Sequence, residues 1–557
     1  MPDSRLPIDT ILVTGRVRTL DAADTVAEAV AVAGDRVHSV GRAADLLAAA
    51  PAGARIIEMD GATLIPGFND AHAHMEREGL KRIRPSLADC RSIADIVALI
   101  RGIAAKTPPG EWIVTMPLGE PPYFFDGVAR LEDKRPPDRA DLDAATTEHP
   151  VCIPGLFGNW GTPPGTTCLN SRALTANGIT GDTRPRVGGI EILTDATGEP
   201  TGIIMEHNPR PMVEFDVLGA VPAFTREERM RGLVRSMQLY NGVGTTSVYE
   251  GHGSAPAVVG LYRDLWERGE LTVRAGLVLS PVWADVAEAA AAMRDWLAYA
   301  RGAGLGDPWL RISGIHLAFG GDPCMAALSR DALPNCGWSG FVEQANDPAT
   351  FEAICHLCAE HDIRLNTIVS DQLRAVVEIL ERVSAKRPIA GKRWVIQHIG
   401  QTDRATLERL ARLDVLVTTI PVYFVWKGGH RYDPARGDGL TPMKTLLDLG
   451  IEAASATDNI PYNPGFTLWS MCARSRRSDG VVLGPSERLT RHQALRSLTV
   501  AGAPLTFEEA VKGPLTPGRY ADLAILDIDP LTADDAALQS LSSRLTMVGG
   551  RIVHEAI

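Results

Sequence analysis

Two histidines one residue apart, His72 and His74, stand in the sequence Asp70-Ala-His-Ala-His74. They follow a short apolar run at 63–65, which is typical of a β-strand. Side chains two positions apart on an extended chain project to the same side, so both imidazoles can reach one metal ion. Taken alone, such a pair is a weak signal that also occurs by chance, in strand ends that face solvent or are satisfied by the backbone.

Three further polar residues end, or directly follow, other predicted strands: His316, His398 and Asp458. Each of them taken singly is more often structural, and an aspartate at a strand end commonly caps the next helix. In a barrel of parallel strands, however, the carboxyl ends of all strands meet at one mouth. These separated segments can therefore meet around one ion.

The elements that must position these residues alternate in type. Between the two ends of the chain, short β-rich runs alternate with long helical stretches, which is typical of βα units around a parallel sheet. The sequence therefore predicts an α/β fold, a distorted (β/α)8 TIM barrel. Its candidate strands are 63–65, 244–249, 271–279, 311–316, 363–367, 394–398, 415–420 and 451–456.

Two further parts are predicted around this barrel, which we assign to residues 64–84 plus 231–504. Both chain ends carry short strands with turn residues, and since chain ends often lie close together, we expect 1–63 plus 505–557 to form a small β-sandwich domain. Residues 85–230 are rich in Pro and Gly and mix helical with strand signals. A structureless loop of that length is improbable, so we predict an inserted α+β subdomain over the active-site mouth.

The composition excludes several classes of partner. The 557-residue chain has a net charge of −12, which argues against binding to nucleic acid. It contains no run of roughly 18 apolar residues that would span a bilayer, and no secretory signal is visible. Its eight cysteines are scattered along the chain, which does not indicate a disulfide framework. We expect them to be free thiols in a reducing cytoplasm. We expect a cytoplasmic protein with a small-molecule substrate, and no membrane partner.

Longer motifs resemble a known family, the amidohydrolase superfamily. Gly67-Phe-Asn-Asp-Ala-His-Ala-His74 is similar to its first-strand metal motif. The similarity runs almost end to end and is to the YtcJ-like branch, with enzymes of the N-substituted formamide deformylase type. Further motifs that carry it are Pro109-Gly-Glu-Trp112, Asn170-Ser-Arg-Ala-Leu174, Gly202-Ile-Ile-Met-Glu206, Gln397-His398, Thr457-Asp458 and 513–523.

This resemblance implies roles for several residues. It implies that His72, His74 and Asp458 bind the catalytic metal, and that Asp458 accepts a proton from the attacking water and delivers it to the leaving group. The sixth-strand histidine of the family is kept as His398. We leave two roles open for it, a metal ligand or a donor that polarises the substrate carbonyl.

The chain departs from the family at two positions. His316 stands where the family commonly has a lysine, often carboxylated, and Thr367 stands where it has the fifth-strand histidine. An imidazole cannot bridge two cations as a carboxylated lysine does, and a neutral hydroxyl is a poor ligand for Zn²⁺. We therefore expect one ion, Zn²⁺ or a similar divalent metal. Its predicted ligands are His72, His74, Asp458 and either His316 or His398.

Four residues outside this set are candidates for contact with substrate: Glu250, His252, Trp160 and Tyr423. The first two follow the second predicted strand, and the aromatic residues stand on predicted loops. A capping or ion-pair role for Glu250 and His252, and a packing role for Trp160 and Tyr423, are the structural alternatives.

The predicted function is hydrolysis of a C–N bond in an amide, formamide or cyclic amide by metal-activated water. The resemblance supplies this substrate class, whereas the residues themselves supply only a hydrolytic metal. The alternatives are a metal-assisted enzyme that decarboxylates or cleaves a C–C bond, and a barrel that has lost catalysis and serves for binding. By analogy with the family we also expect a homodimer.

Overall fold

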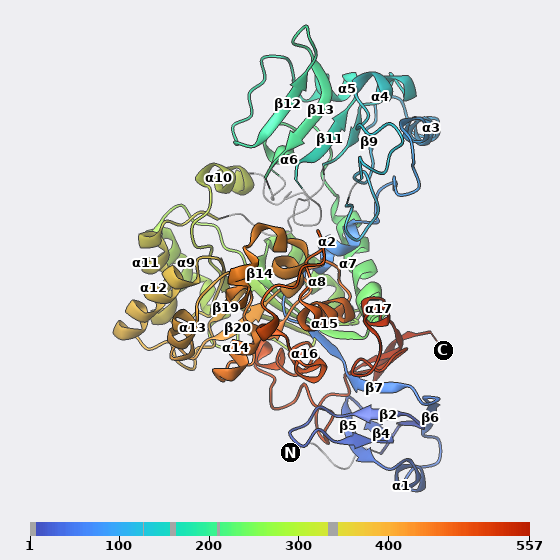
Figure 1. Ribbon diagram of the computed structural model, residues 1–557, viewed down its shortest axis with the longest axis vertical. Helices are drawn as coiled ribbons and strands as arrows, with labels where there is room; N and C mark the ends of the chain where they lie inside the picture. The colour runs from blue at the N-terminus through green and yellow to red at the C-terminus, as the bar shows by residue number, and fades with distance from the viewer. Residues whose placement is uncertain (1–6, 126, 156–162, 209–211, 332–343, 557) are drawn as a thin grey trace. The chain divides into compact units, whose positions relative to one another are not determined.

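Parallel strands form the centre of the larger of two structural units (Figure 1). In this computed structural model the first unit comprises 1–74, 237–320 and 346–557, and the second comprises 75–236 and 321–345. The structure describes residues 7–125, 127–155, 163–208, 212–331 and 344–556.

The parallel strands of the first unit form a nearly closed barrel, which confirms the predicted fold. The strands pair in the order β21-β20-β19-β18-β17-β15-β14-β8. Between the two ends of this order, Ala71 N donates to Ser455 O at 3.4 Å, and Asp458 N donates to His72 O at 3.0 Å. The strands are β8 (Phe68–Asp70), β14 (Thr245–Ser254), β15 (Arg274–Leu279), β17 (Leu310–His316), β18 (Leu365–Ser370), β19 (Val395–Ile399), β20 (Leu416–Thr419) and β21 (Ala454–Ser455).

Amphipathic helices follow the barrel strands and bury their apolar faces in the main core. In α12, Val376, Leu380 and Val383 lie three or four residues apart and are fully buried, as the helical repeat requires. Asp403 starts α13 by accepting a hydrogen bond from Thr406 N, which satisfies an otherwise unpaired amide. The helices of this part are α8 (Pro256–Glu267), α9 (Val286–Asp295), α11 (Pro348–His361), α12 (Leu373–Lys386), α13 (Arg404–Ala411), α14 (Met443–Asp448), α15 (Pro464–Ala473) and α16 (Arg491–Ser497).

Two further sheets belong to the same unit, one of N-terminal strands alone and one of strands from both chain ends. The first has the order β5-β4-β1-β6 and the second the order β24-β23-β22-β7-β2-β3. In the second sheet β22 pairs antiparallel with β7, so the two ends of the chain share one sheet. The strands are β1 (Thr10–Val13), β2 (Arg16–Arg18), β3 (Val26–Ala27), β4 (Ala29–Ala33), β5 (Arg36–Gly41), β6 (Arg55–Glu58), β7 (Thr63–Pro66), β22 (Leu523–Leu526), β23 (Ser543–Val548) and β24 (Arg551–Glu555).

The prediction that 63–65 is the first barrel strand is wrong. These residues lie in β7, which belongs to the terminal sheet, and the first barrel strand is β8. The chain passes from one sheet to the other at Gly67. A Cβ at this position would lie 2.2 Å from the Thr246 side chain on β14, so only glycine allows this close approach of the backbone.

The second unit has a mixed sheet of order β12-β13-β11-β10-β9. Its longest strand is β13 (Pro200–Glu206), and α3 (Ile93–Ala104) begins with a capping box between Ser92 and Asp95, a signal that fixes the start of a helix. The insertion predicted at 85–230 lies within this unit, to which 321–345 are added. Its placement over the active-site mouth stays a prediction. The other elements are β9 (Ile113–Val114), β10 (Val151–Ile153), β11 (Gly165–Leu169), β12 (Ile190–Thr194), α2 (Met75–Leu80), α4 (Arg139–Ala145), α5 (Ser171–Ala176), α6 (Val213–Asp216) and α10 (Pro323–Asp331), with α7 (Arg226–Asn241) running into the first unit.

Within the parts of the chain that the structure describes, no helix combines the length and the apolar character needed to cross a membrane.

Candidate metal centre

The first-strand histidines, His72 and His74, follow β8 and are buried. Their ring centroids lie 5.0 Å apart. Backbone contacts to the segment after β21 fix both residues, since His74 N donates to Asn459 Oδ1 at 2.8 Å and His72 O accepts from Asp458 N. The pair is therefore held against the last barrel strand.

Two of the predicted partners lie directly beside this pair. His398, at the end of β19, places its Nε2 3.1 Å from Nε2 of His72. Asp458 places Oδ1 3.2 Å from Nε2 of His74 and 3.9 Å from Nε2 of His72. The structure thus brings together the ends of the first, sixth and eighth strands, as the sequence predicted.

His252 on the second strand and His316 on the fourth strand extend the cluster. The His252 ring lies 4.7 Å from that of His316, 6.0 Å from that of His72 and 5.7 Å from that of His74. The ligand atoms of His72, His74 and His252 all lie within 4.8 Å of one another. His252, predicted to contact substrate, therefore lies among the candidate ligands.

Burial sets the protonation of two of these imidazoles. It lowers the pKa of His72 well below its usual value, with the neighbouring histidines adding to the effect, and it lowers the pKa of His398 to about 4. Both rings are therefore neutral at pH 7, which is the form that binds a metal. Thr367 on β18 is also buried, and its hydroxyl has no hydrogen-bond partner among the described residues.

Asp70, one residue before the histidine motif, ties the cluster together. Its carboxylate accepts hydrogen bonds from His72 N at 3.2 Å and from the amide and hydroxyl of Thr457. Burial raises the pKa of Asp70 to about 7. This role of Asp70 was not predicted from the sequence, although its position within the histidine motif was a signal for it.

Glu250, a predicted substrate contact, lies beside a candidate ligand. Its Oε2 lies 3.7 Å from Nδ1 of His74, and its Oε1 accepts a hydrogen bond from the Tyr262 hydroxyl at 2.7 Å. A carboxylate on the second nitrogen of a metal-binding histidine fixes the orientation and tautomer of the ring. This contact favours an orienting role for Glu250.

Only one of the two aromatic residues predicted to contact substrate lies within the described parts of the chain. Trp160 lies outside the described residues. Tyr423 lies in a single π-helical turn, Val422–Lys427, after β20. The Lys427 ammonium and the Arg431 guanidinium each lie 5.4 Å from the centre of the Tyr423 ring. Burial lowers the pKa of Lys427 to about 7, against the opposing effect of Asp458. Lys427 was not among the residues predicted from the sequence, because a π-helical turn has no clear sequence signal.

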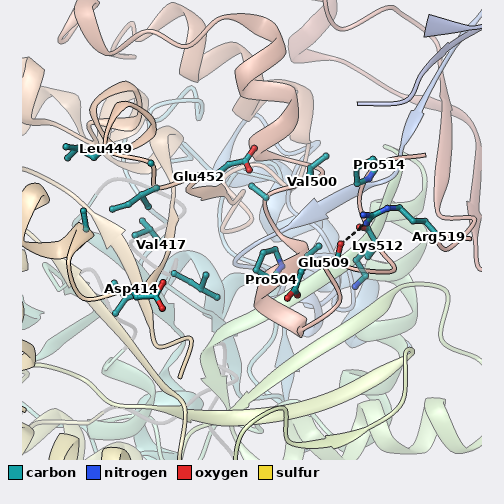
Figure 2. A pocket seen from close by; sticks show the side chains of 17 residues that line it. Asp414, Val417, Leu449, Glu452, Val500, Pro504, Glu509, Lys512, Pro514 and Arg519 are labelled. Carbon is teal, nitrogen blue, oxygen red and sulfur yellow. Dashed lines mark hydrogen bonds between the residues drawn. The ribbon is translucent and has the colours of Figure 1, made fainter. Parts of the chain in front are cut away.

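A separate pocket of about 400 Å³ lies at the other end of the barrel strands (Figure 2). Leu416 and Val417 at the start of β20, and Glu452 before β21, line it together with Lys512 and Arg519 of the C-terminal segment. The histidine cluster instead lies at the carboxyl ends of the strands. Because barrel enzymes carry their active sites at the carboxyl ends, this pocket is not the candidate site.

The family model of the amidohydrolase family matches residues 55–554. The chain belongs to the amidohydrolase family. This amidohydrolase is 24% identical to the N-substituted formamide deformylase of Arthrobacter pascens over 580 residues, covering 98% of each chain. It is 24% identical to the putative amidohydrolase YtcJ of Bacillus subtilis (strain 168) over 521 residues, covering 90% of each chain. The resemblance predicted from the sequence motifs is confirmed.

Solved structures agree on the fold. An uncharacterized metal-dependent hydrolase from Pyrococcus horikoshii OT3 aligns with a TM-score of 0.66 and 18% sequence identity, over 95% of this amidohydrolase and 99% of that chain. At this identity the likeness shows a shared fold.

Proposed function

We propose that this amidohydrolase hydrolyses a C–N bond of a small amide, formamide or cyclic amide, with one divalent metal ion, Zn²⁺, as its cofactor. The observation that carries the proposal is the meeting of His72, His74, His398 and Asp458 from three separate strand ends. The deformylase relative, aligned over 98% of each chain, supports the substrate class.

The donor set fits a zinc ion. Neutral imidazoles and a carboxylate are ligands that Zn²⁺ prefers. The Nε2 atoms of His72 and His398 lie 3.1 Å apart. Without a metal, one of the two nitrogens donates a hydrogen bond to the other, whereas with a cation bound between them both nitrogens offer it their lone pairs. When bound, the ion lowers the pKa of a water molecule toward about 7 and so supplies hydroxide at neutral pH.

The residues around the proposed metal ion have different roles, in proton transfer and in orienting its ligands. Asp458 accepts the proton of the attacking water and returns it to the leaving nitrogen, since an amine leaves only after protonation. Glu250, with Oε2 3.7 Å from Nδ1 of His74, is placed to orient this ring. His398 has the two roles left open by the sequence, ligand or donor to the developing oxyanion.

Metal analysis and product analysis test the proposal together. Protein purified without chelators is expected to carry one ion per chain, to lose activity on dialysis against a chelator, and to regain it with one equivalent of Zn²⁺. A panel of N-substituted formamides and cyclic amides is expected to release amine or open its ring. Two ions per chain would contradict the single centre.

Other outcomes favour the alternative functions. Release of CO₂ without hydrolysis of any amide would favour the metal-assisted decarboxylase, for which the unusual His316 and Thr367 leave room. Protein that holds no metal after chelator-free purification would favour a binding barrel without catalysis. A homodimer is part of the same proposal, and analytical ultracentrifugation tests it.

A further inference from the structure

We infer that His252 is a ligand of this metal ion. Its imidazole takes the place of the fifth-strand histidine, a position at which this chain has Thr367. The inference rests on the proposed function and adds a ligand from the second strand, a residue that the sequence predicted to contact substrate. It implies a centre in which the ion is held nearer to the first and second strands of the barrel.

The distances place His252 beside the first-strand pair, where it can share their ion. Among the described residues, His72, His74 and His252 form the one group of potential ligands whose donor atoms all lie within 4.8 Å of one another. A single ion can therefore contact all three imidazoles at once. His398 and Asp458 also lie close to members of the pair, so His252 adds to these candidate ligands.

A bulge in β14 directs His252 toward this position. Along β14, Glu250 pairs with Leu277 and Ser254 pairs with Leu279. Ser254 is thus four residues after Glu250, whereas Leu279 is only two residues after Leu277, so β14 has two extra residues between these pairs. Bulges of this kind re-aim a side chain and are frequent beside active sites.

The glycines on either side of His252 make this bulge possible. Gly253 has a φ of +86°, and a Cβ there would lie 2.9 Å from the Cβ atoms of His316 and Ser280. A Cβ on Gly251 would lie 2.3 Å from the side-chain nitrogen of Gln397, which instead donates to Gly251 O at 2.9 Å. Side chains of β17 and β19 therefore pack closely against the bulge, and at Gly253 both the positive φ and the contact with two Cβ atoms favour glycine.

The residue at the fifth strand is consistent with a ligand role for His252. Thr367 is buried at the fifth strand, and its neutral hydroxyl is a weak ligand for Zn²⁺. The first-strand pair supplies two imidazoles, and the ion takes its remaining ligands from other strands, since catalytic zinc sites commonly have three protein ligands and one open position. His252 can supply one of these ligands from the second strand.

Metal affinity and the spectrum of the Co²⁺-substituted protein test the inference without reference to activity. In His252→Ala, and in His252→Gln, which keeps more side-chain volume, competition with a chromogenic chelator is expected to show affinity reduced by at least about 100-fold. The visible absorption of the Co²⁺ protein is expected to change, because one nitrogen donor is lost. The control is His38→Ala, an exposed histidine of the terminal sheet, which should bind metal as the native protein does.

A rescue experiment sharpens the test. If His252 replaces the fifth-strand histidine, His252→Ala combined with Thr367→His should regain part of the lost affinity. Native affinity and a native Co²⁺ spectrum in both folded His252 variants would overturn the inference while leaving the proposed function intact. Failure of the native protein to bind any metal would instead overturn the proposed function itself.

Discussion

The carboxylate of Asp70 accepts hydrogen bonds from both the backbone amide and the hydroxyl of Thr457, the former at 3.0 Å. This contact joins the first barrel strand to the last, at the point where their carboxyl ends carry the histidine pair and Asp458. The same carboxylate accepts from His72 N. One buried group thus positions candidate ligands that are nearly 390 residues apart in the sequence.

Removing the Thr457 hydroxyl is expected to loosen the metal centre. In Thr457→Val the side-chain volume is nearly kept, but Asp70 loses a buried hydrogen bond, which costs about 1–3 kcal/mol of stability. Because partners of this kind orient ligands, we expect metal affinity to fall by about 10- to 100-fold. Thermal unfolding and chelator competition measure the two effects. Thr457→Ser keeps the hydroxyl and is the control, and equal affinity in both variants would contradict the role of Asp70.

A second buried contact anchors the terminal sheet to the barrel. Arg274 on β15 donates to both oxygens of Asp522, directly before β22, at 2.7 and 3.1 Å, and both side chains are buried. Arg274→Met leaves the Asp522 carboxylate buried without its cation, which is expected to destabilise the fold by about 3–5 kcal/mol. The double variant Arg274→Met/Asp522→Leu is expected to recover most of this loss. Chemical denaturation of both variants measures it, and a single variant as stable as the native protein would refute the anchoring role.

The barrel could be predicted from the sequence because its strands are short apolar runs whose type does not depend on distant residues. His398 at the end of β19 is an example, since the run 394–398 indicates both the strand and the position of its last side chain. The assignment of 63–65 failed for the opposite reason. Which sheet that run joins is decided by its pairing with β22, more than 450 residues away in the chain.

The grouping of His252 with the first-strand histidines could not be predicted from the sequence, for a related reason. The spacing of Glu250 and His252 suggests two residues on one face of a regular strand, but the pairing of β14 with β15 shifts between Glu250 and Ser254. The bulge depends on close contacts with Gln397 and His316 from other strands. Such contacts are set by the closed barrel, so a local pattern cannot reveal them.

Helix packing in the second unit depends on a backbone contact between two glycines. A Cβ on Gly79 of α2 would lie 1.7 Å from the carbonyl oxygen of Gly232 on α7. Gly79→Ala therefore forces the helices apart, and we expect a loss of about 1–3 kcal/mol of stability. Gly102→Ala on α3 is the matched control, because a Cβ there meets nothing within 4 Å. The control should gain about 0.5–1 kcal/mol from its better helix propensity. Thermal melts that rank the two variants the other way would contradict the packing argument.

Glu206, at the end of β13, should make the stability of the second unit depend on pH. Its buried carboxylate accepts hydrogen bonds from Met212 N at 2.7 Å and Val213 N at 3.3 Å, yet burial raises its pKa from 4.5 to about 7. Between these values the folded state holds a proton that the unfolded chain has released. The stabilisation by the protonated form is therefore complete below about pH 4.5 and is lost as the pH rises through 7.

Glu206→Gln removes this titration and is expected to flatten the pH dependence. The stability of the variant relative to the native protein should rise across the window from 4.5 to about 7, by on the order of 3 kcal/mol at 1.36 kcal/mol for each pH unit. Denaturation midpoints at pH 5, 6, 7 and 8 measure it. Glu199→Gln, which removes an exposed carboxylate next to the same strand, controls for the loss of one charge. A constant difference between Glu206→Gln and the native protein at all four pH values would show that the buried carboxyl does not titrate in this window.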